Sequence, residues 1–281
     1  MKIAIIFDRY NQGTLGVYYQ KALEKAGVGV THFWLKDARA IEPSFDAYFR
    51  VDDGDYKFDI DHNRLKPSFF YVSDVHLKKP FRAIKEAARF YSHLFCAQYD
   101  GYLKLKRVCA HKVSWLPHAC DSELHRDAGI ERKLDIAFVG NDGGNPRKFI
   151  LQELRERYPN SSIDTAPYSD ISRIYSGARI GFNYSIGSDI NMRTFESMAG
   201  GAMLLTNRID GNGFQKLFKD RTHLVAYRDP REIFELIGHY LRRDNERSAI
   251  AEAGKRLVLL EHTYDKRAAT VLETIRRFVH K

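Results

Sequence analysis

The chain has 281 residues, 44% of them hydrophobic, and a formal net charge of +9. This length suits two domains with packed cores. No apolar run approaches the roughly 20 residues that a membrane span needs, and the run over residues 2–7 is too short for a signal peptide. The three cysteines, Cys96, Cys109 and Cys120, lack metal-ligand spacing and cannot all pair, which favours reduced thiols in the cytoplasm.

The first half of the chain alternates predicted strands and helices. A strand over residues 2–7, a helix over 17–26 that Gly27 closes, and a strand that begins at Gly29 form a βαβ opening, the unit of a parallel sheet. Further strands are predicted at Ala47–Phe49, Phe69–Val72, His93–Ala97 and Lys112–Leu116, with a helix at Pro80–Arg89. Residues 51–66, dense in Asp and Lys, indicate an exposed loop or a short hairpin.

A second series of strands and helices follows residue 117. The predicted strands are Leu134–Val139, Ser162–Asp164, Ala178–Asn183, Ala202–Thr206 and His223–Ala226. The predicted helices are Pro146–Tyr158, Ile171–Ser176, Met192–Ala199, Pro230–Leu241 and two long tail helices broken near His262–Thr263. We therefore predict an α/β fold of two facing, doubly wound Rossmann-like domains. Since such sheets bind ligands at the carboxyl ends of their strands, the active site is expected in the interdomain cleft.

The stretch from Asp189 to Thr206 is the most informative part of the sequence. It predicts a loop, a helix from Met192 and a buried strand. A loop that enters a helix offers free N–H groups and a positive dipole end, which suits a phosphate. Arg193 and Glu196 lie one turn apart on the same side. A glutamate that accepts hydrogen bonds from a ribose diol, beside amides and an arginine that hold a diphosphate, predicts a nucleotide-sugar site.

A glycine-rich turn follows the strand at 134–139. Gly140 and its neighbours lead into a helix start, where glycines let the backbone approach a ligand and Arg147 can pair with a phosphate oxygen. An ordinary tight turn is the alternative. No Gly-Lys-Ser/Thr follows, so the segment is no P-loop, and the absent Gly-x-Gly-x-x-Gly spacing argues against an NAD-dependent oxidoreductase.

Candidate catalytic groups and metal ligands are few. Asp74 and His76 follow the strand at 69–72, where either can orient a sugar or take a proton from an acceptor hydroxyl; a helix-capping aspartate and a surface histidine are the alternatives. No His/Cys/Asp cluster has metal spacing. The segment 52–55 (Asp-Asp-Gly-Asp) imitates an Asp-x-Asp metal site but is expected in a polar, solvent-exposed loop.

A basic region extends over residues 76–112. It holds two acidic residues, Glu86 and Asp100, and nine basic ones: Lys78, Lys79, Arg82, Lys85, Arg89, Lys104, Lys106, Arg107 and Lys112. A solvated helix face is one interpretation. An anionic membrane surface and an anionic acceptor, such as DNA or a phosphorylated glycan, are the others. The sequence carries no signal for an oligomeric state.

Several of these segments occur together in a known group. The chain resembles the GT-B glycosyltransferases, most closely the CgeB-like "glycosyl transferases group 1" and more distantly the retaining glycosyltransferase family 4. The matching segments cover most of residues 113–270 and are 115–121 (Trp-Leu-Pro-His-Ala-Cys-Asp), 138–141 with Arg147, 180–183 (Ile-Gly-Phe-Asn), 190–196 (Ile-Asn-Met-Arg-Thr-Phe-Glu), 200–201 (Gly-Gly), and 262–264 (His-Thr-Tyr) with Arg267.

The resemblance implies hexosyl or pentosyl transfer from a nucleotide-diphosphate sugar to a hydroxyl acceptor, with no cofactor and no metal. It implies an acceptor-side domain over residues 1–117, a nucleotide-sugar-binding domain over 118–262, and a C-terminal helix over 263–281 that packs back on the first domain. It carries donor-binding roles over to these positions: Gly140, Asn141, Arg147, Asn191, Arg193, Thr194 and Glu196. Arg193 also stabilises the leaving group, and Asp74 or His76 acts as the base if the reaction inverts.

One departure limits the resemblance. Family 4 places another glutamate eight positions before the ribose one, where this chain has Ser188, and Asp189 is off register. The sugar, the base, the acceptor and the stereochemistry stay open, with glycans, lipid-linked glycans, proteins and modified DNA bases as acceptors; nucleic acid is not favoured. The alternative function is a non-catalytic nucleotide- or polyanion-binding protein on the same fold. The expected location is cytoplasmic, with a peripheral place at the inner membrane surface compatible with the charge.

Overall fold

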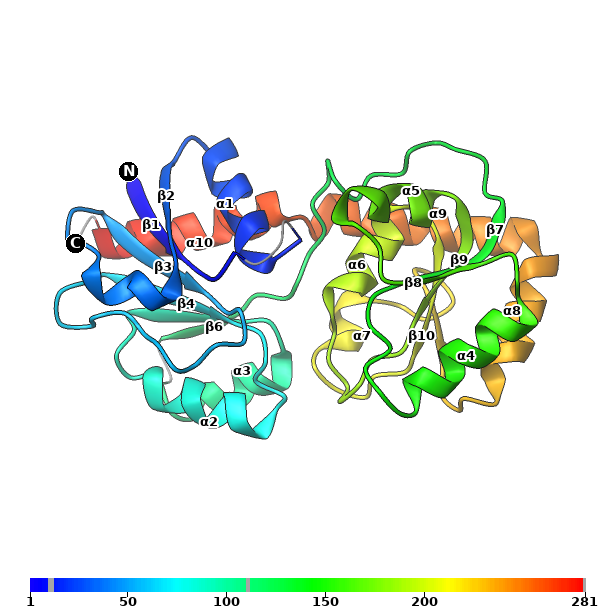
Figure 1. Cartoon of the computed structure of the whole chain (residues 1–281), viewed down its shortest axis with the longest axis horizontal. Coiled ribbons are helices and arrows are strands. Elements are labelled where there is room, and N and C mark those ends of the chain that lie inside the picture. The colour runs from blue at the N-terminus through cyan, green and yellow to red at the C-terminus, as the bar shows by residue number, and fades with distance from the viewer. Residues whose placement is uncertain (10–12, 110–111, 280–281) are drawn as a thin grey trace. The chain divides into compact units, whose positions relative to one another are not determined.

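The computed structural model of the chain describes residues 1–9, 13–109 and 112–279, so the ranges 1–117, 76–112 and 263–281 above include positions outside the described residues. The chain divides into two compact units. The first contains Met1–Pro117 and Tyr264–Lys281, and the second contains His118–Thr263. Each unit is a parallel sheet flanked by helices (Figure 1).

The first unit holds, in its described residues, a six-stranded parallel sheet in the order β2-β1-β3-β4-β5-β6. Its strands are β1 (Lys2–Ile6), β2 (Gly29–Phe33), β3 (Ala47–Val51), β4 (Ser68–Val72), β5 (His93–Cys96) and β6 (Val113–Trp115). All five residues of β4, Ser-Phe-Phe-Tyr-Val, are buried, as expected for a central strand covered on both faces. The order reverses between β1 and β3, so the strand ends at 6–8 and 51–53 flank the switch point of this sheet.

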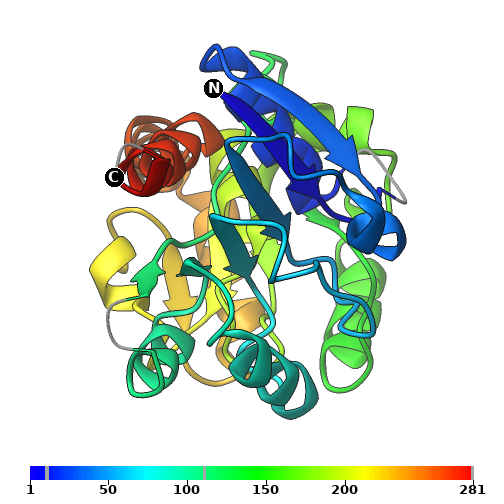
Figure 2. The same cartoon turned by 90° about the vertical axis from the view of Figure 1, so that its left-hand side faces the viewer.

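Helices cover this sheet on both faces. They are α1 (Leu15–Lys25), the 3-10 helix η1 (Leu35–Ala40), α2 (Lys78–Ala87), α3 (Tyr99–Lys106) and α10 (Tyr264–Val279). The helices α2 and α3 follow neighbouring strands and lie side by side in both views (Figures 1 and 2). Lys104 on α3 reaches the ring of Phe81 on α2, with Nζ 5.8 Å from the ring centroid.

The last helix belongs to the first unit. Tyr264 at the start of α10 stacks on Tyr18 of α1, with ring centroids 4.8 Å apart. Arg267 is buried and donates from Nε to the backbone oxygen of Pro117 at 2.7 Å. These contacts tie α10 to α1 and to the end of the first segment of this unit.

The second unit holds a five-stranded parallel sheet in its described residues, in the order β11-β10-β9-β7-β8. The strands are β7 (Leu134–Val139), β8 (Ser162–Asp164), β9 (Ala178–Asn183), β10 (Met203–Asn207) and β11 (Val225–Tyr227). The helices are α4 (Arg147–Arg157), α5 (Ile171–Ser176), α6 (Met192–Ala199), α7 (Phe214–Leu217), α8 (Glu232–Arg242) and α9 (Asp244–Glu261). The chain leaves β7 toward β8 and returns to the other side of β7 at β9, so the switch point lies between β7 and β9.

Two expectations for the first unit are corrected. Asp52, expected in an exposed loop, is 4% exposed. Its carboxylate accepts hydrogen bonds from the Tyr56 hydroxyl at 2.8 Å and from the Ser73 backbone N–H at 2.8 Å, so it joins the ends of β3 and β4. In addition, α3 forms where no helix was predicted. None of the helices in the described ranges is long and apolar enough to cross a membrane.

Candidate functional site

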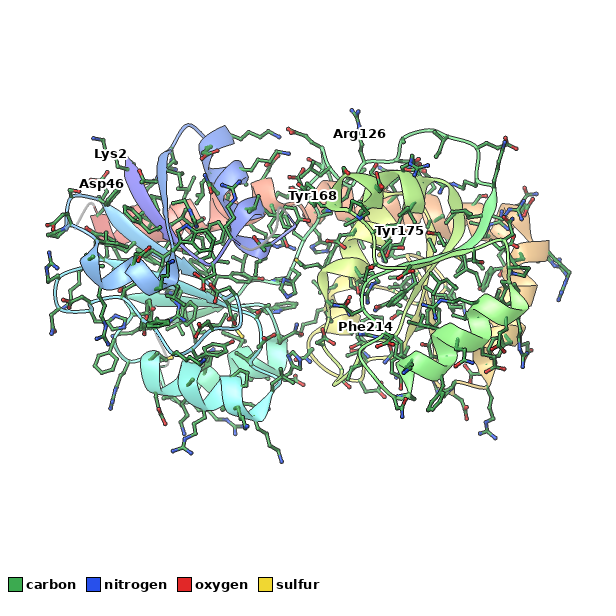
Figure 3. The ribbon with its side chains drawn as sticks, viewed as in Figure 1. Lys2, Asp46, Arg126, Tyr168, Tyr175 and Phe214 are labelled. Carbon is green, nitrogen blue, oxygen red and sulfur yellow. The ribbon has the colours of Figure 1, made fainter. Side chains whose placement is uncertain are left out.

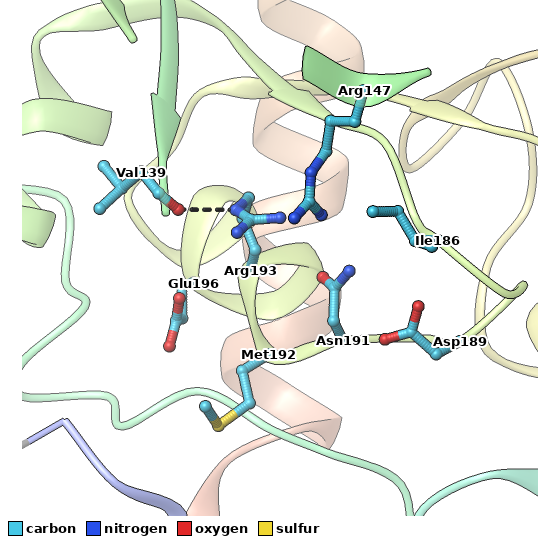
Figure 4. A pocket seen from close by; sticks show the side chains of 8 residues that line it. All are labelled: Val139, Arg147, Ile186, Asp189, Asn191, Met192, Arg193 and Glu196. Carbon is cyan, nitrogen blue, oxygen red and sulfur yellow. Dashed lines mark hydrogen bonds between the residues drawn. The ribbon is translucent and has the colours of Figure 1, made fainter. Parts of the chain in front are cut away.

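A pocket of about 300 Å³ opens at the carboxyl ends of β7 and β9, at the switch point of the second sheet (Figure 4). Its lining combines two arginines, a glutamate and the first residues of α6. The lining residues are Val139, Arg147, Ile186, Asp189, Asn191, Met192, Arg193 and Glu196. Doubly wound sheets bind ligands at this place, because the connections that follow the two neighbouring strands run to opposite faces of the sheet and leave a crevice.

The helix α6 begins at this pocket. Asn191 is its N-cap: the side-chain oxygen accepts a hydrogen bond from the Thr194 backbone N–H at 3.3 Å. An asparagine in this position satisfies one of the four N–H groups that a helix start leaves without an intrahelical partner. The positive end of the helix dipole therefore faces the pocket and favours an anion there.

Arg193, in the first turn of α6, is held in place by both neighbouring strands. Its Nε donates to the backbone oxygen of Val139, the last residue of β7, at 2.7 Å (Figure 4). A terminal nitrogen donates to Oδ1 of Asn183, at the end of β9, at 2.9 Å. The guanidinium carbon lies 4.2 Å from the centroid of the Phe138 ring. These contacts fix a cation at the switch point.

Arg147 reaches the same pocket from the first turn of α4. It donates to three backbone oxygens, those of Asn141 (2.9 Å), Asp142 (2.8 Å) and Tyr184 (3.2 Å). Burial and the neighbouring Arg193 charge lower the pKa of Arg147. A partly buried arginine whose pKa is lowered by a neighbouring cation indicates a site prepared for an anion, because an anion beside both groups offsets their repulsion.

The end of β7 has its own support. Tyr175 of α5, labelled in Figure 3, is fully buried, and its hydroxyl accepts the Val139 N–H at 3.2 Å. Burial raises the pKa of Tyr175 to about 12, so the hydroxyl is protonated at neutral pH. Both polar backbone groups of Val139 are therefore satisfied by side chains, and Arg193 has a fixed acceptor.

Glu196 lies one turn after Arg193 and lines the same pocket, with its side chain 12% exposed. Its Oε1 is 3.7 Å from Nε2 of His125, a buried residue of the second unit. The carboxylate thus faces the pocket instead of the apolar core of the unit. A carboxylate can accept hydrogen bonds from hydroxyl groups, and two arginines beside a helix start present positive charge to an anion.

Gly140, the residue after β7, has a φ of +145°. A Cβ at this position would lie 2.1 Å from a terminal nitrogen of Arg193, so the glycine makes room for the guanidinium. We expect Gly140→Ala to lower the free energy of unfolding, measured by urea denaturation, by about 1–3 kcal/mol, because it adds backbone strain and displaces Arg193.

Gly144→Ala is the matched control for this substitution. Gly144 also has a positive φ, +84°, but no atom lies within 4 Å of an added Cβ, so the variant measures the backbone strain alone. The displacement of Arg193 is the difference between the two variants. If Gly140→Ala lowers the free energy of unfolding no more than Gly144→Ala does, the close approach of Arg193 to Gly140 does not contribute to stability.

The structure brings some of the predicted site residues together and separates others. Arg147, Asn191, Arg193 and Glu196 line one pocket. The other three predicted donor-site residues, Gly140, Asn141 and Thr194, stand behind it: the first accommodates Arg193, the second gives its backbone oxygen to Arg147, and the third is buried beneath the Asn191 cap.

Asp74 and His76 lie in the first unit, in the turn between β4 and α2. The Asp74 N–H donates to Asp52 at 3.3 Å, and its backbone oxygen accepts from the Leu77 N–H at 3.1 Å. Nδ1 of His76 is buried and has no hydrogen-bond partner among the described residues.

Sequence reasoning did not select four lining residues: Val139, Ile186, Asp189 and Met192. Val139 and Met192 had a signal, since they end a strand and begin a helix beside the predicted turn. Asp189 was set aside as off register, yet it lines the pocket and accepts a hydrogen bond from the Ser185 hydroxyl at 2.6 Å. The residue before it, Ser188, has a φ of +61°, a conformation that the sequence does not indicate. No group of three or more metal-ligating side chains is found in the described parts of the chain.

A family model described as "Glycosyl transferase-like" matches residues 122–273, more than half of the chain. The chain belongs to this glycosyl transferase-like family. The matched range contains every pocket residue, from Val139 to Glu196. The GT-B glycosyltransferase resemblance of the sequence is thereby confirmed at the level of the family. No curated protein matches the sequence significantly.

Solved structures of glycosyltransferases share the fold of this family member. Anabaena Alr3699/HepE, solved in complex with UDP and glucose, is 12% identical, with a TM-score of 0.73 over 98% of this chain and 99% of that chain. An alpha-glucosyltransferase in complex with UDP and a 13-mer DNA containing an HMU base is 12% identical, with a TM-score of 0.70 over 100% of both chains. Sucrose-phosphate synthase from Thermosynechococcus elongatus is 11% identical, with a TM-score of 0.65 over 98% of each chain. The α/β fold predicted from the sequence, with two Rossmann-like parallel sheets, is confirmed.

Proposed function

We propose that this glycosyl transferase-like protein moves a sugar from a nucleotide-diphosphate sugar to a hydroxyl acceptor. The observation that carries the proposal is the placement of Arg147, Arg193, the start of α6 and Glu196 around one pocket at the switch point of the second sheet. In this proposal the second unit binds the donor and the first unit binds the acceptor.

The donor is held by its diphosphate and its ribose. The two arginines and the first N–H groups of α6 bind the diphosphate, and the Glu196 carboxylate accepts hydrogen bonds from the ribose hydroxyls. UDP is the first nucleotide to test, because HepE and the alpha-glucosyltransferase were solved with UDP. GDP is the second, since the proposed contacts are to the diphosphate and the ribose, which UDP and GDP share.

Transfer breaks the bond between the sugar carbon and the diphosphate oxygen and forms a bond from that carbon to the acceptor oxygen. Negative charge grows on the leaving diphosphate, next to Arg193 and Arg147 and the positive end of α6. These fixed positive groups lower the barrier without a metal ion, because they are already oriented when the charge appears.

The acceptor hydroxyl also loses a proton. In an inverting reaction the proton passes to Asp74 or His76, of which His76 has a buried nitrogen with no partner in the described residues. In a retaining reaction the leaving phosphate takes the proton, and neither side chain is required as a base.

Hydrolysis and transfer assays with a panel of UDP- and GDP-sugars test the proposal. Release of UDP or GDP that depends on Arg193 supports it. Tight nucleotide binding with no turnover, with or without glycan, lipid-linked, protein and modified-DNA acceptors, would instead favour a non-catalytic nucleotide-binding protein. Ser188, in place of the family 4 glutamate, is the residue that keeps this second function open.

The basic helices α2 and α3 extend the proposal to a partner. Exposed lysines and arginines of these helices are near exposed apolar side chains in the sequence, of which Leu77 is 45% and Leu103 is 41% exposed. Exposed leucines among basic residues favour an anionic lipid surface over a free anion. We therefore place the enzyme in the cytoplasm, peripheral at the inner membrane surface.

Replacement of Lys78, Lys79 and Arg82 by serine is expected to weaken binding to vesicles that contain anionic lipid by roughly 100-fold at low salt, because each basic residue near such a surface contributes about 1 kcal/mol. Vesicle co-sedimentation over a range of salt concentrations measures this effect. UDP affinity is expected to stay unchanged.

The matched control removes three exposed arginines of the second unit, Arg242, Arg243 and Arg256, with the same change of net charge. If vesicle binding weakens equally in both variants, the loss is explained by the change in net charge and not by the position of the basic residues on α2. Binding to duplex DNA in place of vesicles, with the same salt dependence, would assign the basic helices to a nucleic-acid acceptor.

A further inference from the structure

His125 is a buried residue beside the pocket that the proposed function does not use. It follows the turn at Cys120–Asp121 in the second unit, and it is 1% exposed. Nδ1 of its ring accepts a hydrogen bond from the Asp121 backbone N–H at 2.9 Å. A backbone amide always donates, so this nitrogen carries no proton.

The proton of the neutral ring must therefore be on Nε2. That nitrogen lies 3.7 Å from Oε1 of Glu196, which is within the distance of an ion pair. In the described part of the chain, no hydrogen bond to the Glu196 carboxylate is present. The distance is longer than a hydrogen bond, and catalytic contacts of this kind often tighten when a ligand binds.

Hydrogen bonds around Asp121 hold the His125 ring in its orientation toward Glu196. The backbone of Asp121 is itself held, because its carboxylate accepts the N–H groups of Glu123 (2.9 Å) and Leu124 (3.1 Å). The His125 N–H donates to the Asp121 backbone oxygen at 2.8 Å. The ring therefore has one orientation, and it presents a single N–H toward a carboxylate that lines the pocket.

We propose that His125 is a positioning residue for Glu196: its Nε2–H holds the carboxylate in the orientation in which it accepts hydrogen bonds from the ribose of the donor. This inference rests on the proposed function. His125 contacts neither the donor nor the acceptor in this account, and its effect on donor binding passes through Glu196.

Two substitutions separate the two nitrogens of the ring. In His125→Asn the amide retains an acceptor for the Asp121 N–H but no longer reaches Glu196. In His125→Gln the longer amide reaches Glu196 with an N–H. We expect the asparagine variant to bind UDP about 5- to 10-fold more weakly than wild type, as for one lost hydrogen bond, and the glutamine variant to bind within about 2-fold of wild type.

Three further measurements distinguish positioning from a structural role. The asparagine substitution should have no effect on UDP affinity in a Glu196→Ala background, and it should weaken 2′-deoxy-UDP binding less than UDP binding. In the wild-type protein, nitrogen NMR should show that the neutral imidazole is protonated on Nε2 and not on Nδ1. This last measurement needs no variant to fold.

The Glu196→Ala and His125→Asn variants together distinguish a failure of this inference from a failure of the proposed function. If Glu196→Ala leaves the UDP and GDP affinities unchanged, the donor site is wrong and this inference fails with it. If Glu196→Ala weakens binding but His125→Asn does not, or weakens it equally in both backgrounds, only the role of His125 is refuted. A ring protonated on Nδ1 would refute it as well.

Discussion

Replacing Arg193 by alanine is expected to lower kcat for sugar transfer by roughly 100- to 1000-fold, the usual effect of removing one fixed charge that stabilises a leaving group. The reason is its place: Arg193 is held by Val139 and Asn183 at the switch point, next to Arg147 and the start of α6. Initial rates at saturating UDP-sugar measure the change.

Arg193→Lys and Arg173→Ala are the controls for this prediction. The lysine keeps a charge but lacks the planar fork that binds Val139 and Asn183 together, so an intermediate rate is expected. Arg173 is an exposed arginine of α5 outside the pocket, and its replacement should leave kcat unchanged. Thermal denaturation should first show that the alanine variant is folded. If this folded variant kept the wild-type kcat, the assignment of Arg193 to the leaving group would be wrong.

Local sequence signals were sufficient for most elements of the second unit. The helix predicted from Met192 to Ala199 is α6 to the residue, because Asn191 is a strong cap and the apolar positions recur at helical spacing. The strands at Leu134–Val139 and Ala178–Asn183 also have the predicted bounds, since each is an apolar run closed by a polar or glycine-containing turn.

The elements that were missed depend on contacts between distant residues. The helix α3 buries Gly101 and Leu105, and a Cβ at Gly101 would lie 2.1 Å from a Val75 side-chain atom, so this helix packs closely on the turn between β4 and α2. Asp52 is buried because Tyr56 and Ser73 donate to it. Propensity and periodicity carry no information on either contact.

In the candidate site, too, local features were predictable from the sequence and contacts between distant residues were not. The residue types around Arg193 and Glu196 indicated an anion and a diol from the sequence alone, since both side chains share one face of a short helix. The partners that orient them were not predictable, because Val139 lies 54 residues before Arg193 and His125 lies far from Glu196 in the chain. His125 follows Asp121 by four residues and has no motif of its own.

Glu196→Ala is expected to raise the Kd for UDP by about 10- to 100-fold while the protein stays folded. The carboxylate is the acceptor for the ribose hydroxyls, and hydrogen bonds to a charged acceptor are worth more than neutral ones. Glu196 is a pocket residue with its side chain 12% exposed, so its removal leaves no large cavity in the core. Isothermal calorimetry with UDP and with GDP measures the loss.

The ribose itself provides the sharpest control for this second prediction. Wild type should bind UDP more tightly than 2′-deoxy-UDP, and Glu196→Ala should bind the two more nearly alike, because the variant has no carboxylate with which to sense the missing hydroxyl. Glu235→Ala, at an exposed glutamate of α8, should retain the wild-type preference. If Glu196→Ala keeps the full preference for UDP, another residue must contact the ribose. The donor would then have a different orientation in the pocket between β7 and β9.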